Sequence, residues 1–325
     1  MPFKIDPELA AALAKLGGGA DNPSPPKLGD VNARRAIIAP GIKALAGSNF
    51  PTDVKTKDYF TASSDGHEVL LRWYCIDDQL QKPAVIYIHG GGMILGSVDE
   101  YHVIVAGYVT RTRVPFLSVE YRLAPEFPYP MPLNDVYTAI AWLSREETQK
   151  SLNVDSRRIA IMGDSGGGGL AAAAALLARQ KGGPQLAKMI LLSPMLDDRT
   201  IQADEHISSL TSWTVADNET GWSAMLGPSR GTAGVPETAS PARMQDATGL
   251  PPAFIEVGEL DLFRDEAIDF ARKYYKAGVS MELHVYPGCT HGFDLFSDES
   301  SKVAKRAFDL RDRAIIAIEP ADVIS

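Results

Sequence analysis

The sequence predicts an α/β protein built on a mostly parallel, eight-stranded sheet that is flanked by helices and covered by a helical cap. The main observation is that short apolar runs alternate with longer helical patterns from residue 54 onward, which is typical of a parallel sheet with helices on both faces. A second observation is the segment GDSGG at residues 163–167, which follows an apolar run and precedes an alanine-rich stretch. This setting predicts a strand, a sharp turn and a helix, with a serine at the turn.

Residues 1–53 are predicted to form an N-terminal cap segment that precedes the sheet. Residues 6–16 have the pattern of a short helix, and a second helical pattern covers residues 30–45. We expect a break in the second helix at Pro40 and Gly41. Two small helices ahead of a sheet are typical of a cap.

The main domain is predicted to cover residues 54–325. It begins with two antiparallel edge strands, at residues 59–63 and 69–75, and a central buried strand follows at residues 84–88. Further strands are expected at residues 116–119, 159–162, 189–192, 254–257 and 282–286, with helices at 101–112, 133–144, 170–180, 265–277 and 302–318. Residues 197–250 contain no strand pattern, so we interpret this insertion as the second part of the cap.

The composition is that of a globular protein with a large core, at 45% hydrophobic and 22% charged residues. A formal net charge of −9 and the absence of a basic run argue against a nucleic-acid partner. No segment has the pattern of a signal peptide or a membrane span, so we expect a cytoplasmic protein without membrane insertion. Cys75 and Cys289 are too few and too far apart for a disulfide framework or a metal site, and we expect free thiols.

Two glycine-rich segments carry the chemistry. In the first, Gly163 and Gly167 permit a tight turn that holds the hydroxyl of Ser165 at the carboxyl end of the sheet. The helix that follows begins at this serine and supplies positive potential where an oxyanion would form. In the second, residues 89–92 (HGGG) follow the central strand, and successive glycines allow backbone N–H groups to approach a ligand closely.

A base and an acid are expected to complete the site. The order nucleophile, acid, histidine excludes the three histidines that precede Ser165. Among the others, His206 lies in the predicted cap and His284 lies within a strand, whereas His291 lies in the loop after the last strand, where catalysis needs it. Three acids follow the strand at residues 254–257 and remain alternatives, namely Glu259, Asp261 and Asp265.

Five motifs, taken together, resemble those of the hormone-sensitive-lipase family of esterases, which is bacterial family IV of the α/β-hydrolase superfamily. They are HGGG at 89–92, YRLAPE at 121–126, GDSGG at 163–167, DLFRDE at 261–266 and HGF at 291–293. The resemblance covers about residues 55–320. It implies that Ser165 is the nucleophile, His291 the base and Asp261 the orienting acid.

The resemblance also implies an oxyanion hole made by the N–H groups of Gly91, Gly92 and Gly166. Gly166 is a departure, since the family usually carries alanine at this position; the N–H group is retained, so we expect the geometry rather than the chemistry to change. Candidate residues of the substrate pocket are Met93 and the tryptophans of the insertion, Trp213 and Trp222.

From this resemblance we expect a serine carboxylesterase that hydrolyses small-molecule esters with short to medium acyl chains through an acyl-enzyme, without a metal or another cofactor. Hydrolysis of amides or lactones by the same residues is an alternative. A hormone-binding receptor of the same superfamily is disfavoured, because such receptors have lost the histidine that is present here as His291. Homodimer formation is also an expectation from the family, although the apolar stripe of residues 302–318 fits its own sheet equally well.

Overall fold

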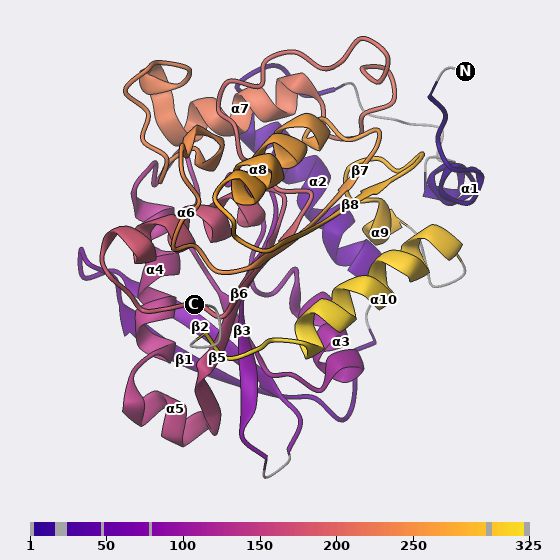
Figure 1. Ribbon diagram of the computed structural model, residues 1–325. Coiled ribbons are helices and arrows are strands. Elements are labelled where there is room, and N and C mark those ends of the chain that lie inside the picture. Colours follow the sequence, from indigo (N-terminus) through magenta and orange to yellow (C-terminus); the bar gives the residue numbers. More distant parts are fainter. Residues whose placement is uncertain (1–2, 17–24, 47–48, 78–79, 297–300, 322–325) are drawn as a thin grey trace.

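An eight-stranded sheet runs through the middle of the protein, with helices on both of its faces, in the computed structural model of the chain (Figure 1). The structure describes residues 3–16, 25–46, 49–77, 80–296 and 301–321. The strands are β1 Lys55–Ala62, β2 Glu68–Cys75, β3 Lys82–Ile88, β4 Phe116–Val119, β5 Val154–Asp164, β6 Lys188–Leu192, β7 Ala253–Gly258 and β8 Met281–Tyr286. Their spatial order is β1-β2-β4-β3-β5-β6-β7-β8.

The predicted fold class is confirmed, because β3 to β8 all pair in parallel and only β2 runs antiparallel to its neighbours. The expectation that the first two strands both lie at the edge was wrong for β2. This strand pairs with β1 on one side and with β4 on the other, and Val69, Leu71 and Trp73 on it are buried. The apolar side chains of β2 are better buried at this inner position of the sheet than they would be at its edge.

Two layers of helices cover the sheet. On one face lie α4 Met131–Leu143, α6 Gly166–Gln180 and α8 Arg264–Lys276, and on the other α3 His102–Thr112 packs against α10 Lys302–Ile316 (Figure 1). The remaining helices are α1 Pro7–Leu16, α2 Val31–Ala46, α5 Glu146–Leu152, α7 Val215–Leu226 and α9 Phe293–Phe296, with short 3₁₀ helices at Gly227–Ser229 and Pro241–Arg243. Of these, α5 and α9 were not predicted.

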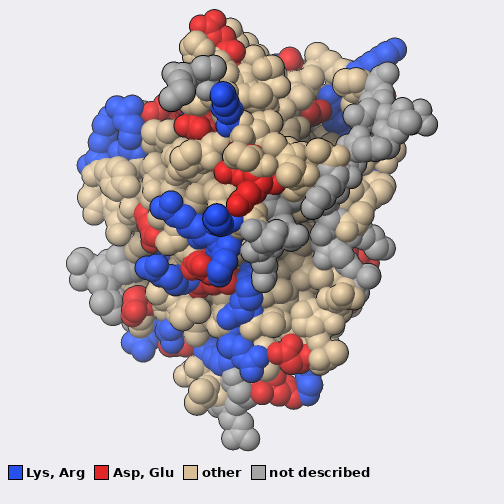
Figure 2. Space-filling model, turned by 90° about the vertical axis from the view of Figure 1, so that its right-hand side faces the viewer, with Lys and Arg blue, Asp and Glu red and all other residues tan. Residues whose placement is uncertain are grey.

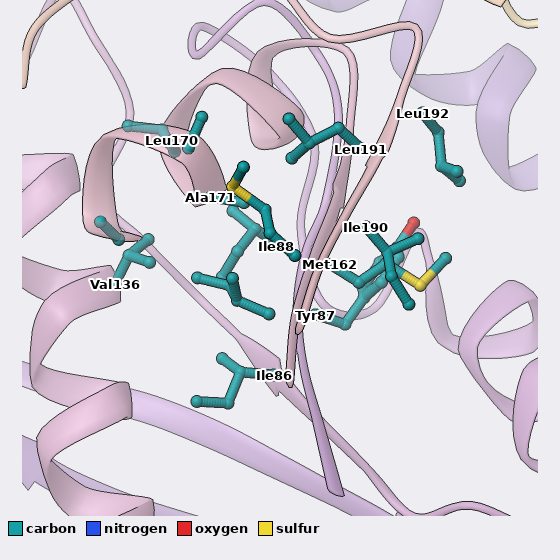
Figure 3. Close-up of a cluster of buried hydrophobic side chains, with 14 of the residues drawn as sticks. Ile86, Tyr87, Ile88, Val136, Met162, Leu170, Ala171, Ile190, Leu191 and Leu192 are labelled. Carbon is teal, nitrogen blue, oxygen red and sulfur yellow. The ribbon is translucent and has the colours of Figure 1, made fainter. Parts of the chain in front are cut away.

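The central strands are buried on both faces, so their side chains alternate between two apolar layers. Ile86 and Ile88 of β3 point toward Leu170 of α6, whereas Tyr87 and Met162 point to the opposite side (Figure 3). Each such side chain contributes about 1.5–3 kcal/mol by leaving water. This core fixes the carboxyl ends of β3, β5, β7 and β8, from which the candidate site is built.

Helix α2 lies beside α7 and α9, so it covers the end of the sheet at which the parallel strands finish. The break expected at Pro40 is absent, and this prediction was wrong. Proline removes one hydrogen bond, to the carbonyl of Ala36, and since Pro40 and Ala36 are both exposed, water can serve that carbonyl. Arg35 links α2 to the loops after β3 and β4, because its guanidinium donates to the carbonyl of Ile94 and to the carboxylate of Glu126.

Helix α1 lies elsewhere, against α9 (Figure 1). Its Leu9 is fully buried in a small cluster with Tyr286, Cys289 and Phe293. The backbone N–H of Asp6 donates to the carbonyl of Gly288. The N-terminal segment therefore supports the loop after β8, and the division into a cap at residues 1–53 and a main domain stays a prediction.

The face that carries α10 shows basic and acidic groups side by side (Figure 2). Ion pairs such as Lys305 with Asp309 and Arg111 with Asp312 join charges on this side. Across the described ranges, no helix combines the length and the apolar character that crossing a bilayer requires.

Candidate active site

Ser165 occupies the sharp turn between β5 and α6. Its backbone has φ 54° and ψ −121°, a strained conformation for a residue with a side chain. Gly163 and Gly167 allow this turn: a Cβ atom on Gly163 would lie 2.3 Å from the carbonyl oxygen of Gly167, and one on Gly167 would lie 2.2 Å from that of Ile88. The motif predicted from the sequence thus has the expected strand, turn and helix around it.

A continuous chain of hydrogen bonds joins the three predicted residues. The Oγ atom of Ser165 lies 2.9 Å from Nε2 of His291, and Nδ1 of the same ring lies 2.8 Å from Oδ2 of Asp261. Asp261 is fully buried, and its other oxygen accepts from the backbone N–H of Phe263. Such a chain can remove a proton from a serine hydroxyl while the carboxylate holds the imidazole in the required tautomer.

The two alternative acids have other partners. Glu259 accepts a hydrogen bond from the N–H of Gly288, and Asp265 pairs with Arg264. The other histidines that follow Ser165 also lie away from it: His284 pairs with Glu282 on β8, and His206 is exposed. Of the alternatives that the sequence left open, the structure brings only Asp261 to the imidazole.

The surroundings of His291 raise the pKa of its imidazole. Burial alone would lower the pKa of its imidazole, but the charge and hydrogen bond of Asp261, together with the charges of Asp164 and Asp294, raise the pKa above its ordinary value. The imidazole ring of His291 makes an edge-to-face contact with the ring of Phe263, and the two ring centroids lie 5.1 Å apart. The backbone carbonyl of His291 accepts a hydrogen bond from the hydroxyl of Ser212.

The glycine loop lies directly against the nucleophile turn. A Cβ atom on Gly166 would lie 2.7 Å from the backbone nitrogen of Met93 and 2.9 Å from that of Gly92, so these peptide groups meet at the start of α6. Within the described ranges, no hydrogen-bond acceptor takes the N–H groups of Gly91, Gly92 or Gly166. Free N–H groups at a helix start beside a serine hydroxyl are suited to binding an oxyanion.

His89 supports this loop from within. It is fully buried, stacks on the ring of Tyr121 at 4.3 Å and donates from Nδ1 to the carbonyl of Gly90. Burial lowers the pKa of its imidazole to about 4, so the ring stays neutral at physiological pH. The hydroxyl of Tyr121 also donates to the carbonyl of His89, which ties the YRLAPE segment to the same loop.

A cavity of about 540 Å³ opens beside Ser165 and His291. Trp213 lines it, as predicted, and its ring packs on the glycine loop, where a Cβ atom on Gly92 would come within 2.7 Å. Met93 and Trp222 are not among the described residues that line this cavity, and both are buried in the core behind it. Their assignment to the pocket therefore finds no support in the structure.

Other parts of the cavity wall were missed by the sequence reasoning. Helix α2 contributes Ile37, Ile38, Gly41 and Ile42, for which the sequence predicts only a place in the cap. Their apolar character gave no signal of which side of the helix faces the site. Because α2 has a weakly periodic sequence, only the fold shows that these side chains reach the cavity.

Three carboxyl groups also line the cavity, at Asp164, Glu256 and Asp294. Asp164, beside the nucleophile, accepts from the hydroxyls of Tyr87 and Tyr101, and burial raises its pKa to about 6. Burial likewise raises the pKa of Glu256 to about 7. Of the three, only Asp164 has a signal in the sequence, because it belongs to the GDSGG motif.

Comparison with known proteins places this geometry among related chains. Residues 85–295 match a protein family described by its alpha/beta hydrolase fold. Carboxylesterase NlhH of Mycobacterium tuberculosis is 34% identical over 251 residues, covering 74% of this chain and 74% of that protein. Ethyl acetate hydrolase of Pseudomonas putida is 28% identical over 305 residues, covering 90% of this chain and 92% of that protein. A solved bacterial heroin esterase superposes with a TM-score of 0.86 at 34% identity, over 96% of this chain and 97% of that one.

Proposed function

The chain belongs to the hormone-sensitive-lipase family of α/β-hydrolases and is a carboxylic ester hydrolase, and on this premise we propose that Ser165, His291 and Asp261 perform the hydrolysis. One observation carries the proposal, namely the unbroken chain of hydrogen bonds from the serine hydroxyl through the imidazole to a buried carboxylate. No other serine and histidine among the described residues are joined in this way.

In the first half of the reaction, Ser165 Oγ attacks the ester carbonyl while His291 Nε2 takes its proton. The carbonyl oxygen becomes an oxyanion, and the N–H groups of Gly91, Gly92 and Gly166 stabilise it. The C–O bond to the alcohol then breaks, His291 returns the proton to the leaving alcohol, and the acyl group stays on Ser165.

In the second half, His291 removes a proton from a water molecule, whose oxygen attacks the acyl-enzyme. The same N–H groups hold the second oxyanion, and the bond to Ser165 Oγ breaks as the serine recovers its proton from the imidazole. Throughout, Asp261 keeps the imidazole in one tautomer and stabilises its charged form. The products are a carboxylic acid and an alcohol.

We further propose that the substrates are small esters with short to medium acyl chains. The cavity beside Ser165 has about 540 Å³, which is within the range of sites that hold one small molecule. The names of an ethyl acetate hydrolase and a heroin esterase among the similar proteins agree with small-molecule esters. A cytoplasmic location and homodimer formation remain predictions.

The test is hydrolysis of p-nitrophenyl esters from acetate to palmitate by the wild type and by Ser165→Ala. We expect turnover of the shorter esters with a burst of p-nitrophenol, because the acyl-enzyme accumulates, and a fall in kcat of about 10⁴-fold or more in the variant. Circular dichroism of Ser165→Ala checks that it is folded. Equal rates for a folded variant and the wild type would overturn the proposal.

A further inference from the structure

Arg311 on α10 is a buried cation that the mechanism above does not use. Its side chain is 1% exposed, and four elements meet at its guanidinium. It donates to the hydroxyl of Tyr108 on α3 at 2.6 Å, pairs with the carboxylate of Asp294 on α9 at 2.8 Å, and forms an ion pair with Glu256 on β7. A buried charge is retained in a fold only when such partners satisfy it.

Both acidic partners are close in sequence to the proposed catalytic groups. Asp294 follows His291 by three residues and is the second residue of α9, a short helix of only four residues. Glu256 lies on β7, whose end leads into the turn that carries Asp261. Asp294 and Glu256 also line the active-site cavity, whereas Arg311 does not. Arg311 therefore links α9, which follows His291, to β7, which precedes Asp261.

We propose that Arg311 is a positioning residue for the histidine: its Nη2 atom joins Asp294 of α9 to Glu256 of β7 while Nη1 contacts Tyr108 of α3, and its charge neutralises the carboxylate of Asp294 beside the imidazole. This inference rests on the proposed roles of His291 and Asp261. It assigns to the last helix of the fold a part in setting the basicity of the imidazole, which no motif in the sequence indicates.

The charges around both groups give the direction of the effect. His291 faces the carboxylates of Asp261, Asp164 and Asp294, which together raise its pKa against the effect of burial. Arg311 faces Glu256 and Asp294, besides the phenols of Tyr108 and Tyr286. Loss of the guanidinium charge leaves Asp294 uncompensated, which favours the imidazolium. Loss of the Asp294 charge favours the neutral imidazole instead, because one carboxylate near the ring is removed and Arg311 then faces Glu256 alone.

The experiment compares Arg311→Gln and Asp294→Asn by the acid limb of the pH profile of kcat/KM. We expect the limb to move up by about half a pH unit in Arg311→Gln and down by a similar amount in Asp294→Asn. Arg311→Lys keeps the charge but not the fork, so its limb should stay near that of the wild type while kcat falls. Arg313→Gln, on an exposed position of the same helix, is the control and should change neither quantity.

A second measurement makes the test independent of turnover. The Nδ1 proton of His291 can be titrated by NMR in each variant, and the same opposite shifts are expected. If the wild type hydrolyses no ester, the proposed function fails, but this titration still decides the role of Arg311. Limbs and titrations that stay unchanged, or that move in the same direction in both variants, overturn the proposal. If Arg311→Gln does not fold, Arg311→Lys decides it: a kcat equal to that of the wild type in the folded lysine variant would overturn the proposal.

Discussion

Gly166, the residue after the nucleophile, brings α6 unusually close to the glycine loop. A Cβ atom there would lie 2.7 Å from the nitrogen of Met93 and 2.9 Å from the nitrogen and Cα of Gly92, closer than side-chain atoms approach a backbone. Alanine, which is usual in the family, therefore requires this loop to shift. We predict that Gly166→Ala lowers kcat for p-nitrophenyl butyrate about tenfold and leaves KM nearly unchanged, because the displaced N–H groups act mainly on the transition state.

The matched control is Gly234→Ala. A Cβ atom at Gly234 meets only the hydroxyl of Thr232, at 3.9 Å, so this variant should keep the activity of the wild type. If Gly166→Ala is as active as the wild type, the spacing between α6 and the glycine loop does not limit the reaction.

Sequence and structure agree to different degrees at this scale. Ser165 and His291 could be predicted because each lies in a motif whose local geometry follows from its own residues. Arg311 could not, since its partner Glu256 lies 55 positions earlier and nothing local relates the two. Trp222 was misplaced because the sequence of a cap helix does not say which side faces the core, and this ring is fully buried there.

At the scale of elements, α2 forms part of the wall of the cavity, and its one glycine leaves space at that wall. Gly41 is helical, lines the cavity, and has open space where its Cβ would lie. We predict that Gly41→Leu fills this space and lowers kcat/KM for longer esters by about 10-fold or more for each methylene excluded, while p-nitrophenyl acetate is hydrolysed as by the wild type. The measurement is an acyl series of p-nitrophenyl esters beside a series of alkyl acetates.

Ala44→Leu is the control, because it places a leucine at an exposed position of α2. Gly41→Ala gives a second check: replacing a glycine inside a helix should raise the free energy of unfolding by about 0.5–1 kcal/mol. An equal loss on short and long esters in Gly41→Leu would mean that the helix has been displaced, and this would contradict the prediction.

The helices show why periodicity alone is an incomplete guide. Strongly amphipathic α8 and α10 were predicted within a few residues, since one face of each must be buried. The short, polar α5 has only one buried residue, Thr148, and therefore no apolar pattern to detect. The unbroken α2 depends on solvent beside Pro40, which is a property of the folded molecule and not of the segment.

At the scale of the whole molecule, alternation of strands and helices was enough to predict the fold class. It did not give the order of the strands, in which β4 lies between β2 and β3. That order is set by which faces the connecting helices cover, and hence by contacts between distant segments. The cavity depends on the same contacts, because residues of α2, α3, the insertion, β7 and the loops after β5 and β8 all contribute to its walls.

Burial of acidic side chains makes the stability of the molecule depend on pH. Burial raises the pKa of Glu256 from 4.5 to about 7 and that of Asp164 from 3.8 to about 6, so the folded state holds these protons more tightly than the unfolded state does. Their stabilisation is complete below the ordinary pKa and is lost as the pH rises through the folded value. The net charge of −9 at pH 7 adds repulsion in the same direction.

Carboxylates with lowered pKa act in the opposite sense. The hydrogen bond from Arg35 lowers the pKa of Glu126 to about 2, so its stabilisation is lost as the pH falls below 4.5. We therefore predict that the melting temperature is highest near about pH 5 and declines toward pH 7. In Glu256→Gln the decline between pH 5 and 7 should be shallower, because one of the buried carboxyls with a raised pKa is gone. Calorimetry from pH 4 to 8 measures both slopes, and a melting temperature that rises from pH 5 to 7 would show that the buried carboxyls do not control the pH dependence.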